Sequence, residues 1–128
     1  MKPILLDTHA AIWFFNGSQN LSETAKRVIL DPDNRINVSV VSVWELVVKI
    51  NVGKLTFADG VTGFLKLIDS NGFQLLNISP QHLLALERLP LYHRDPFDRI
   101  LIATAMSEEM DFVTADEDIL KYPLQCVW

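Results

Sequence analysis

Two carboxylates follow short apolar segments at positions where they could act on one substrate. Asp7 comes directly after residues 4–6, and Asp116 follows residues 112–114; both segments are typical of buried strands. In a parallel sheet the carboxyl ends of the strands share one edge, and neighbouring strands lie only about 5 Å apart. Either acid alone could be an ordinary helix N-cap. If the two strands are neighbours, the pair predicts a site with at least two acids.

A third acid, Asp98, lies in the segment Asp95-Pro96-Phe97-Asp98, which predicts the start of a helix. Asp95 suits the N-cap, Pro96 the first helical position and Asp98 the third. Capping accounts for Asp95 completely. Asp98, in the first turn, could face either the solvent or the crevice at the edge of the sheet.

A fourth acid, Glu45, interrupts a helix predicted from residue 41 to about residue 52 that is apolar almost all round. Ser42, Glu45 and Lys49 share one face of this helix and form a single polar stripe. One interpretation is a solvated stripe with a Glu45–Lys49 pair, worth about 0.3 kcal/mol. The other is that the stripe follows the rim of the crevice, where Glu45 joins the other acids.

Three or four carboxylates that converge in a crevice repel one another and need a compensating cation. Mg²⁺ or Mn²⁺ prefers such oxygen ligands and keeps part of its water. An ion held in this way suits phosphodiester hydrolysis, because it can activate water and stabilise the developing negative charge. The scheme needs no histidine. His9 and His82 are expected to pack or to lie at the surface, and His93 with Arg94 lies in a predicted loop that could contact phosphate.

The composition excludes several other classes of protein. The chain has 128 residues, 49% of them hydrophobic, and a net charge of −5, so a strongly basic nucleic-acid coat is excluded although a local basic patch is not. The single cysteine, Cys126, can form neither an internal disulfide nor a cysteine-based zinc site. No apolar run approaches the ~20 residues of a membrane span, and the segment before Asp7 is too short for a signal peptide. We expect one soluble cytoplasmic domain over residues 1–128.

Short apolar strands alternate with helices along the chain. Strands are predicted at residues 4–6, 36–39, 73–78, 111–114 and 124–127, with helices between them. This order is typical of an α/β fold: a three-layer α/β/α sandwich with a largely parallel central sheet of about five short strands. Trp13, Phe14 and Phe15 are adjacent in the first helix, so they cannot all face the core, and one of them is expected at an interface.

Short blocks of sequence occur in a characteristic order: LLDTHA at 5–10, SVWEL at 42–46, Lys49 with GKL at 53–55, DPFDRILIA at 95–103 and VTAD at 113–116. Together they closely resemble the PIN-domain family, specifically the VapC-type toxins of bacterial toxin–antitoxin systems. Each block alone is weak, but the ordered set spans the chain from Leu5 to at least Tyr122. The α/β/α sandwich agrees with the PIN fold that this resemblance implies.

The resemblance implies a specific site and activity. It implies Mg²⁺-dependent endoribonuclease activity (with Mn²⁺ as the alternative ion), toxicity through RNA cleavage, inhibition by a small antitoxin protein, and a homodimer. The family's metal-binding and catalytic quartet falls on Asp7, Glu45, Asp98 and Asp116.

Other polar residues are expected to support this quartet. Thr114 matches the family's hydroxyl residue before the last acid, and Asp118 is a second candidate for that acid, although Asp116 fits the Thr-x-Asp spacing better. Ser42 and Arg99 complete the supporting set. The side chains expected to guide the RNA backbone are Lys49, Lys54, Arg94 and Arg99.

Two other classes of function remain as alternatives. A receiver-type signalling module also has this size, an α/β fold and a Mg²⁺-binding acid cluster. It would need paired acids after the first strand, whereas Asp7 is single, and an aspartate after the third, where residues 73–77 contain none. A non-catalytic PIN-like interaction protein is the second alternative, but such proteins usually lose acids of the quartet.

Overall fold

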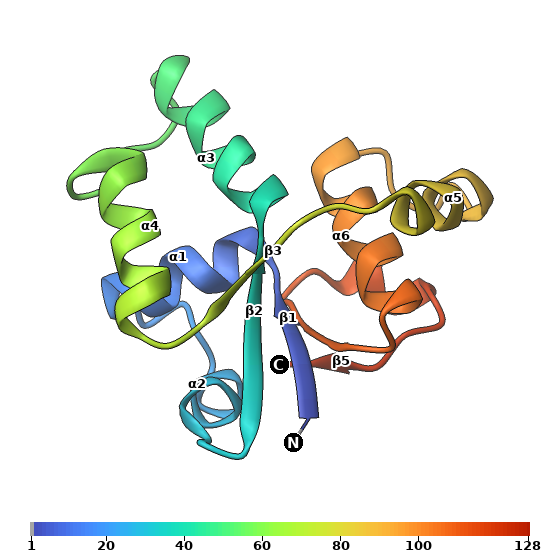
Figure 1. Ribbon diagram of the computed structural model, residues 1–128, viewed down its shortest axis with the longest axis horizontal. Helices are drawn as coiled ribbons and strands as arrows, with labels where there is room; N and C mark the ends of the chain where they lie inside the picture. Colours follow the sequence, from blue (N-terminus) through green and yellow to red (C-terminus); the bar gives the residue numbers. More distant parts are fainter. Residues whose placement is uncertain (1) are drawn as a thin grey trace.

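Five parallel strands form the centre of the computed structural model, which describes residues 2–128. The strand order is β3-β2-β1-β4-β5, so β1 lies in the middle of the sheet (Figure 1). The strands are β1 (Lys2–Leu6), β2 (Asn34–Ser39), β3 (Gln74–Leu76), β4 (Asp111–Val113) and β5 (Cys126–Val127). The helices are α1 (Thr8–Asn16), α2 (Glu23–Leu30), α3 (Val40–Asn51), α4 (Gly60–Ser70), α5 (Pro80–Arg88), α6 (Pro96–Ser107) and the short 3₁₀ helix η1 (Glu117–Lys121).

Helices cover both faces of the sheet, so the strands are buried on two sides. On β1, Ile4 and Leu6 pack into a cluster with α1, α2 and α4, while Leu5 between them packs into a second cluster with α6. Successive strand residues point to opposite faces, and this accounts for the unbroken apolar run. Figure 1 shows α1, α2 and α4 on one side of the sheet and α5 and α6 on the other. The predicted three-layer α/β/α sandwich is confirmed.

Local signals in the sequence determine where most helices begin and end. Ser22 accepts a hydrogen bond from the Ala25 amide and caps α2. Ser79 and His82 form a reciprocal capping box at the start of α5. The α1 helix ends at Gly17, whose φ of 62° lies in the left-handed region that glycine adopts without a Cβ clash.

The third strand is shorter than the sequence predicts. Instead of residues 73–78, β3 covers Gln74–Leu76, because it is an edge strand that pairs only with β2. Beyond it, Ile78 packs into the cluster with α6 while the chain crosses toward α5.

The order of the strands creates a switch point between β1 and β4. From β1 the chain first moves outward to β2 and β3, and later returns to the other side of β1 with β4 and β5. The chain segments that follow β1 and β4 leave in opposite directions at this switch point, and a crevice remains beyond the carboxyl ends of the strands. Among residues 2–128, no helix is both long enough and apolar enough to cross a membrane.

Candidate metal and catalytic site

Asp7 lies at this switch point, immediately after β1. Its backbone amide donates to the carbonyl of Val113 in β4 (2.9 Å), so the two strands are neighbours and their carboxyl ends are held together. Its Oδ2 accepts a hydrogen bond from the Thr114 hydroxyl (2.7 Å), and its Oδ1 accepts one from the His9 amide at the start of α1. Asp7 is therefore both a helix cap and a buried carboxylate. Burial raises its pKa above the ordinary value, although the bond from Thr114 opposes that effect.

Asp95 and Asp98 separate into the two roles that the sequence left open. The Asp95 carboxylate accepts hydrogen bonds from the amides of Phe97 and Asp98 and caps α6. Asp98 faces the crevice. Burial, followed by the negative charge of Asp7, raises the pKa of Asp98 from 3.8 to about 7. The ionised form of Asp98 is consequently unfavourable in this crevice unless a cation compensates its charge, and otherwise the side chain binds a proton.

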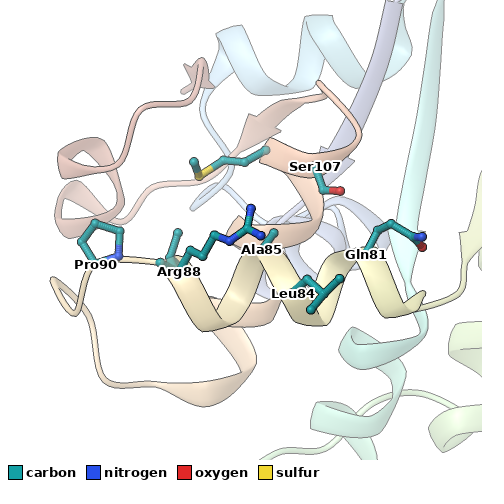
Figure 2. Close-up of a pocket in the computed structure, with 8 residues that line it drawn as sticks. Gln81, Leu84, Ala85, Arg88, Pro90 and Ser107 are labelled. Carbon is teal, nitrogen blue, oxygen red and sulfur yellow. The ribbon is translucent and has the colours of Figure 1, made fainter.

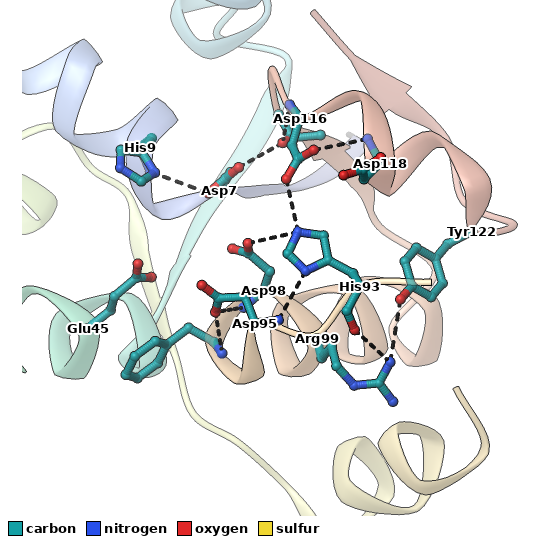
Figure 3. Close-up of polar contacts among 12 residues, drawn as sticks. Asp7, His9, Glu45, His93, Asp95, Asp98, Arg99, Asp116, Asp118 and Tyr122 are labelled. Atoms are coloured by element: carbon teal, nitrogen blue, oxygen red, sulfur yellow. Dashed lines mark hydrogen bonds and ion pairs between the residues drawn. The ribbon is translucent and has the colours of Figure 1, made fainter. Parts of the chain in front are cut away.

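His93 lies between Asp98 and Asp116, which the sequence did not predict (Figure 3). Its Nε2 is 3.0 Å from Asp116 Oδ2 and 3.3 Å from Asp98 Oδ2. Its Nδ1 accepts a hydrogen bond from the Asp95 amide, so the neutral ring carries its proton on Nε2, directed at the two acids. Burial would lower the pKa of His93, but the bond to Asp116 and the charge of Asp98 outweigh it and raise the pKa.

Glu45 reaches the crevice from α3 and is only 2% exposed, so the solvated-stripe interpretation is wrong. Lys49 does pair with it, with Nζ 2.6 Å from Oε2. The other carboxylate oxygen, Oε1, is buried without a hydrogen-bond partner among the described residues. A buried carboxylate oxygen without a partner is costly, and a bound cation or a water molecule would satisfy it. Burial lowers the pKa of Lys49, but the hydrogen bond and charge of Glu45 raise it by more.

The predicted supporting residues have different roles. The hydroxyls of Ser42 and Thr8 share a hydrogen bond of 2.7 Å that ties α3 to the start of α1, behind the acids. Thr114 bonds Asp7 directly and also accepts from the Asp116 amide. Asp118 lies at the surface, where its side chain is 64% exposed and 3.4 Å from Lys121.

Arg99 is held away from the acids by contacts with the loop before α6 and with Tyr122. Its guanidinium donates hydrogen bonds to the carbonyls of Leu89, Pro90 and His93 and to the hydroxyl of Tyr122. Figure 3 shows it directed away from the acids, toward Tyr122. Arg99 therefore fixes the loop that carries His93 and is not free to guide RNA. Arg94 and Lys54 are exposed.

The acids line a pocket of about 260 Å³ whose walls come from distant parts of the chain: Asp7, His9, Ala10, Trp13, Asp98, Ala115 and Asp116. Larger hollows exist elsewhere. One of about 450 Å³ lies between α5 and α6, where Leu84, Ala85, Leu89, Pro90 and Met106 dominate and Arg88 is the one charged residue (Figure 2). This hollow is larger than the acidic pocket, but it holds no cluster of titratable groups, so the chemistry belongs to the smaller pocket.

The donor set of the smaller pocket fits a divalent cation. Carboxylate oxygens of Asp98 and Asp116 lie within 4.8 Å of each other and of the His93 Nε2 that orients them, so one ion can bridge the two carboxylates. The charges of Asp7 and Glu45 act on Asp98, which places both of these acids within electrostatic reach of it. The unpartnered Oε1 of Glu45 and the raised pKa of Asp98 are the two observations that a bound cation would resolve.

Helices cover both faces of the parallel sheet, and carboxylates converge at its switch point. These features define an α/β protein with a candidate acidic metal site. Residues 4–124 match the family model described as the PIN domain. Because this match covers most of the sequence, the chain belongs to the PIN domain family. This membership favours the PIN interpretation over the receiver-type alternative.

Known proteins of similar sequence and structure carry VapC or VapBC names. Ribonuclease VapC22 of Mycobacterium tuberculosis (strain ATCC 25618 / H37Rv) is 29% identical over 117 residues, which are 91% of this chain and 88% of that protein. VapBC2 of Rickettsia felis, solved with a DNA fragment from its promoter, has a TM-score of 0.72 at 16% identity, over 97% of this chain and 96% of that one. VapC20 of Mycobacterium tuberculosis, a sarcin-ricin loop cleaving toxin, has a TM-score of 0.67 at 16% identity, over 94% and 95%. At these identities the two structures show the fold.

Proposed function

We propose that this chain is a divalent-metal-dependent endoribonuclease toxin of a toxin–antitoxin pair, acting as one domain over residues 1–128. Membership of the PIN domain family and similarity to ribonuclease VapC22 support the class of activity. The observation that carries the metal dependence is the crowding of carboxylates around Asp98, where burial and the charges of Asp7, Asp95 and Glu45 raise its pKa to about 7. Oε1 of Glu45 adds to it, because this oxygen is buried without a partner while Oε2 pairs with Lys49.

The metal would be held by Asp7, Glu45, Asp98 and Asp116, with Mg²⁺ or Mn²⁺ as the ion that oxygen donors favour. When bound, the ion supplies charge that activates water and stabilises the phosphodiester undergoing hydrolysis. His93 donates from Nε2 and holds the carboxylates of Asp98 and Asp116 in one orientation. Thr114 does the same for Asp7 through its hydroxyl. Each acid is thus positioned before substrate arrives, and little reorganisation remains for the reaction itself.

The role of Lys49 is to limit the negative charge of the site without removing it. Its ammonium neutralises one oxygen of Glu45 and is 31% exposed, so it also offers a cation at the rim of the crevice where a phosphate could approach. The overall charge of −5 predicts modest affinity for RNA that decreases with salt.

The decisive experiment is incubation of the purified chain with total RNA, with Mg²⁺, with Mn²⁺ and with a chelator. We expect discrete RNA fragments only when the metal is present. The control is Asp98→Asn protein purified in the same way, which distinguishes this activity from a contaminating ribonuclease. If RNA remains intact with both metals while the protein still binds them, the chain is instead the non-catalytic PIN-like module.

The antitoxin and a second copy of the chain are the proposed protein partners. Several structures similar to this chain are of VapBC proteins. Apolar side chains suited to protein contacts remain exposed on α3, where Trp44 is 59% exposed, at Val52 just after it (62%), and on α5, where Leu83 and Leu84 are each 53% exposed. A toxin that acts on cellular RNA would work in the cytoplasm. The measurement is growth on expression of the chain alone and together with the product of an adjacent small gene.

A further inference from the structure

One wall of the acidic pocket is aromatic. Trp13 lines this pocket together with Asp7, Asp98 and Asp116. Its ring lies 5.8 Å from that of Trp128 and 5.7 Å from that of His9, centroid to centroid. His9 is exposed and Trp128 is 38% exposed, so the aromatic wall reaches the solvent.

The two aromatic neighbours of Trp13 in α1 serve the core instead. Phe14 and Phe15 pack against Phe73, and Phe15 also packs edge-on against Phe64. Trp13 also contacts the core cluster, but it is the one of the three that lines the acidic pocket.

A second hollow, of about 330 Å³, adjoins the acidic pocket on the same side. Ala115 and Asp116 belong to the walls of both. The remaining walls of the second hollow are mostly apolar, with Leu120 (63% exposed), Cys126, Val127 and Trp128. Its charged residues are the acids Asp116 and Glu117, and neither Lys nor Arg lines it.

We propose that Trp13, Trp128 and this adjoining hollow form a subsite for one unpaired nucleobase next to the phosphate bound at the acids. This inference rests on the proposed ribonuclease function and names a part of the substrate that the site would recognise. Bases and phosphates alternate along a strand, so a phosphate at the acids brings the neighbouring base to the adjoining wall. A second phosphate would be repelled by Asp116 and Glu117, whereas a neutral flat ring is accepted by an apolar, aromatic surface.

This subsite requires a single-stranded or looped substrate. A base that stacks on Trp13 must leave its own helical stack, which is least costly in loops, bulges and ends. Stacking alone accepts all four bases, so any preference would come from the polar edge of the hollow at Asp116 and Glu117.

The test measures binding of end-labelled uridine, adenosine and cytidine hexamers by fluorescence anisotropy in Ca²⁺, with the integrity of the RNA checked on a gel. A second probe set carries one abasic ribose at each position in turn. Trp13→Leu is expected to weaken the tightest-binding hexamer about tenfold, whereas Trp13→Phe, which keeps an aromatic face, weakens it by no more than about twofold. Leu65→Ala removes an exposed apolar side chain from α4, outside both hollows, and is expected to leave binding unchanged.

The abasic probes decide between stacking and a structural effect. The unmodified protein should lose most affinity at one abasic position, and Trp13→Leu should lose nothing further on that probe. An equal loss on the intact and abasic probes, or an equal loss in Leu65→Ala, would overturn the proposal. So would a Trp13→Leu variant that binds RNA normally and loses only a protein partner. Failure of the ribonuclease proposal itself is distinguishable, because then the unmodified chain does not cleave RNA with Mg²⁺ or Mn²⁺.

Discussion

The pair of central strands β1 and β4 has an acidic residue near each of its two ends, and the ends differ in whether a base pairs with the acid. At the amino end, Asp111 pairs with Lys2 at 2.7 Å, one acid with one base. At the carboxyl end, Asp7, Asp98 and Asp116 crowd together, and His93 is the nearest partner that can donate to two of them. The amino end of this strand pair is therefore electrically neutral, whereas the carboxyl end keeps an excess of negative charge.

This difference separates a structural ion pair from a site. The Lys2–Asp111 pair is at the surface, where Lys2 is 60% exposed, and such pairs contribute at most about 1 kcal/mol. At the carboxyl edge, burial and mutual repulsion raise the pKa of both Asp7 and Asp98, so the fold maintains an arrangement that is unfavourable without a ligand. Acids that crowd together in a pocket are therefore better evidence for a functional site than an acid that forms a surface ion pair.

The largest expected effect is that of Asp98→Asn on cleavage. The substitution removes one charge from the pocket and a preferred ligand of Mg²⁺, so RNA cleavage should fall by at least about 100-fold. The free energy of unfolding without metal should stay level or rise, because repulsion with Asp7 is relieved. Cleavage assays and metal-free thermal melts measure both.

The matched control is Asp95→Asn, three residues away in the same helical turn. Asparagine caps a helix about as well as aspartate, so both cleavage and melting temperature should change little. If Asp95→Asn abolishes cleavage while Asp98→Asn keeps it, the assignment of the ligand is wrong. If both remain active, the metal-site proposal fails.

The second prediction concerns pH and metal together. Asp98 has a pKa near 7 in the folded chain and about 3.9 when unfolded, so the folded state binds more protons in that interval. The free energy of unfolding of the metal-free protein should therefore decrease as pH rises from about 4 to about 7. The raised pKa of His93 acts in the same direction above about pH 6.5.

Mg²⁺ should reverse this loss. At about 100 times its Kd, the ion adds about 2.7 kcal/mol to the free energy of unfolding. The gain should be larger at pH 8 than at pH 5, since the acids are ionised at the higher pH. Thermal melts at several pH values, with Mg²⁺ and with chelator, test this. A gain independent of pH, or one undiminished in Asp98→Asn, would contradict the proposed site.

The third prediction compares His93 and His82, the two histidines whose Nδ1 accepts a hydrogen bond from a backbone amide. His93→Gln should reduce cleavage by about tenfold, because Asp98 and Asp116 lose the donor that orients them. His82→Gln disturbs the buried capping box of α5, so it should lower the melting temperature and leave the rate of the folded fraction unchanged. The opposite pattern, in which only His82→Gln reduces the cleavage rate, would show that His93 does not orient the acids.

The smallest expected effect is at the amino end of the sheet. Lys2→Met should lower the free energy of unfolding by about 0.5 kcal/mol, with cleavage unaffected. Lys2→Arg keeps the charge and should be neutral. Chemical denaturation measures this difference, and a loss of cleavage in Lys2→Met would show that the two ends of the sheet are not independent.

Local patterns in the sequence were sufficient for most of the fold. Alternation of strands and helices predicted the parallel α/β/α sandwich, and the Asp95-Pro96 pair predicted the start of α6. These features depend on hydrogen bonds within four residues and on burial of one helical face, which short stretches of sequence specify. The extent of β3 was overestimated because pairing at an edge depends on the neighbouring strand, not on the apolar run itself.

The site itself was only partly predictable. Asp7, Asp98, Glu45 and Asp116 were expected near one another; the structure places Asp7, Asp98 and Asp116 in one pocket and Glu45 close enough for its charge to raise the pKa of Asp98. The contacts of Arg99 were not predictable, because most of its partners are carbonyls of the loop before α6, which carry no signal in the sequence. The role of His93 was left open for a similar reason. Its position two residues before the Asp95 cap was the available hint, but its contact with Asp116 joins residues 23 positions apart in the chain.

The sequence by itself determined which elements form and which residue types stand at their ends, because capping and periodicity are local. Only the tertiary structure decided that β1 and β4 are neighbours, which joins Thr114 to Asp7 across 107 residues of chain. It also decided that Glu45 is buried with a free oxygen, that Asp98 and not Asp95 faces the acids, and that Trp13 lines their pocket. Burial and electrostatic repulsion depend on distances between atoms, and distances between residues far apart in sequence exist only once the chain has folded.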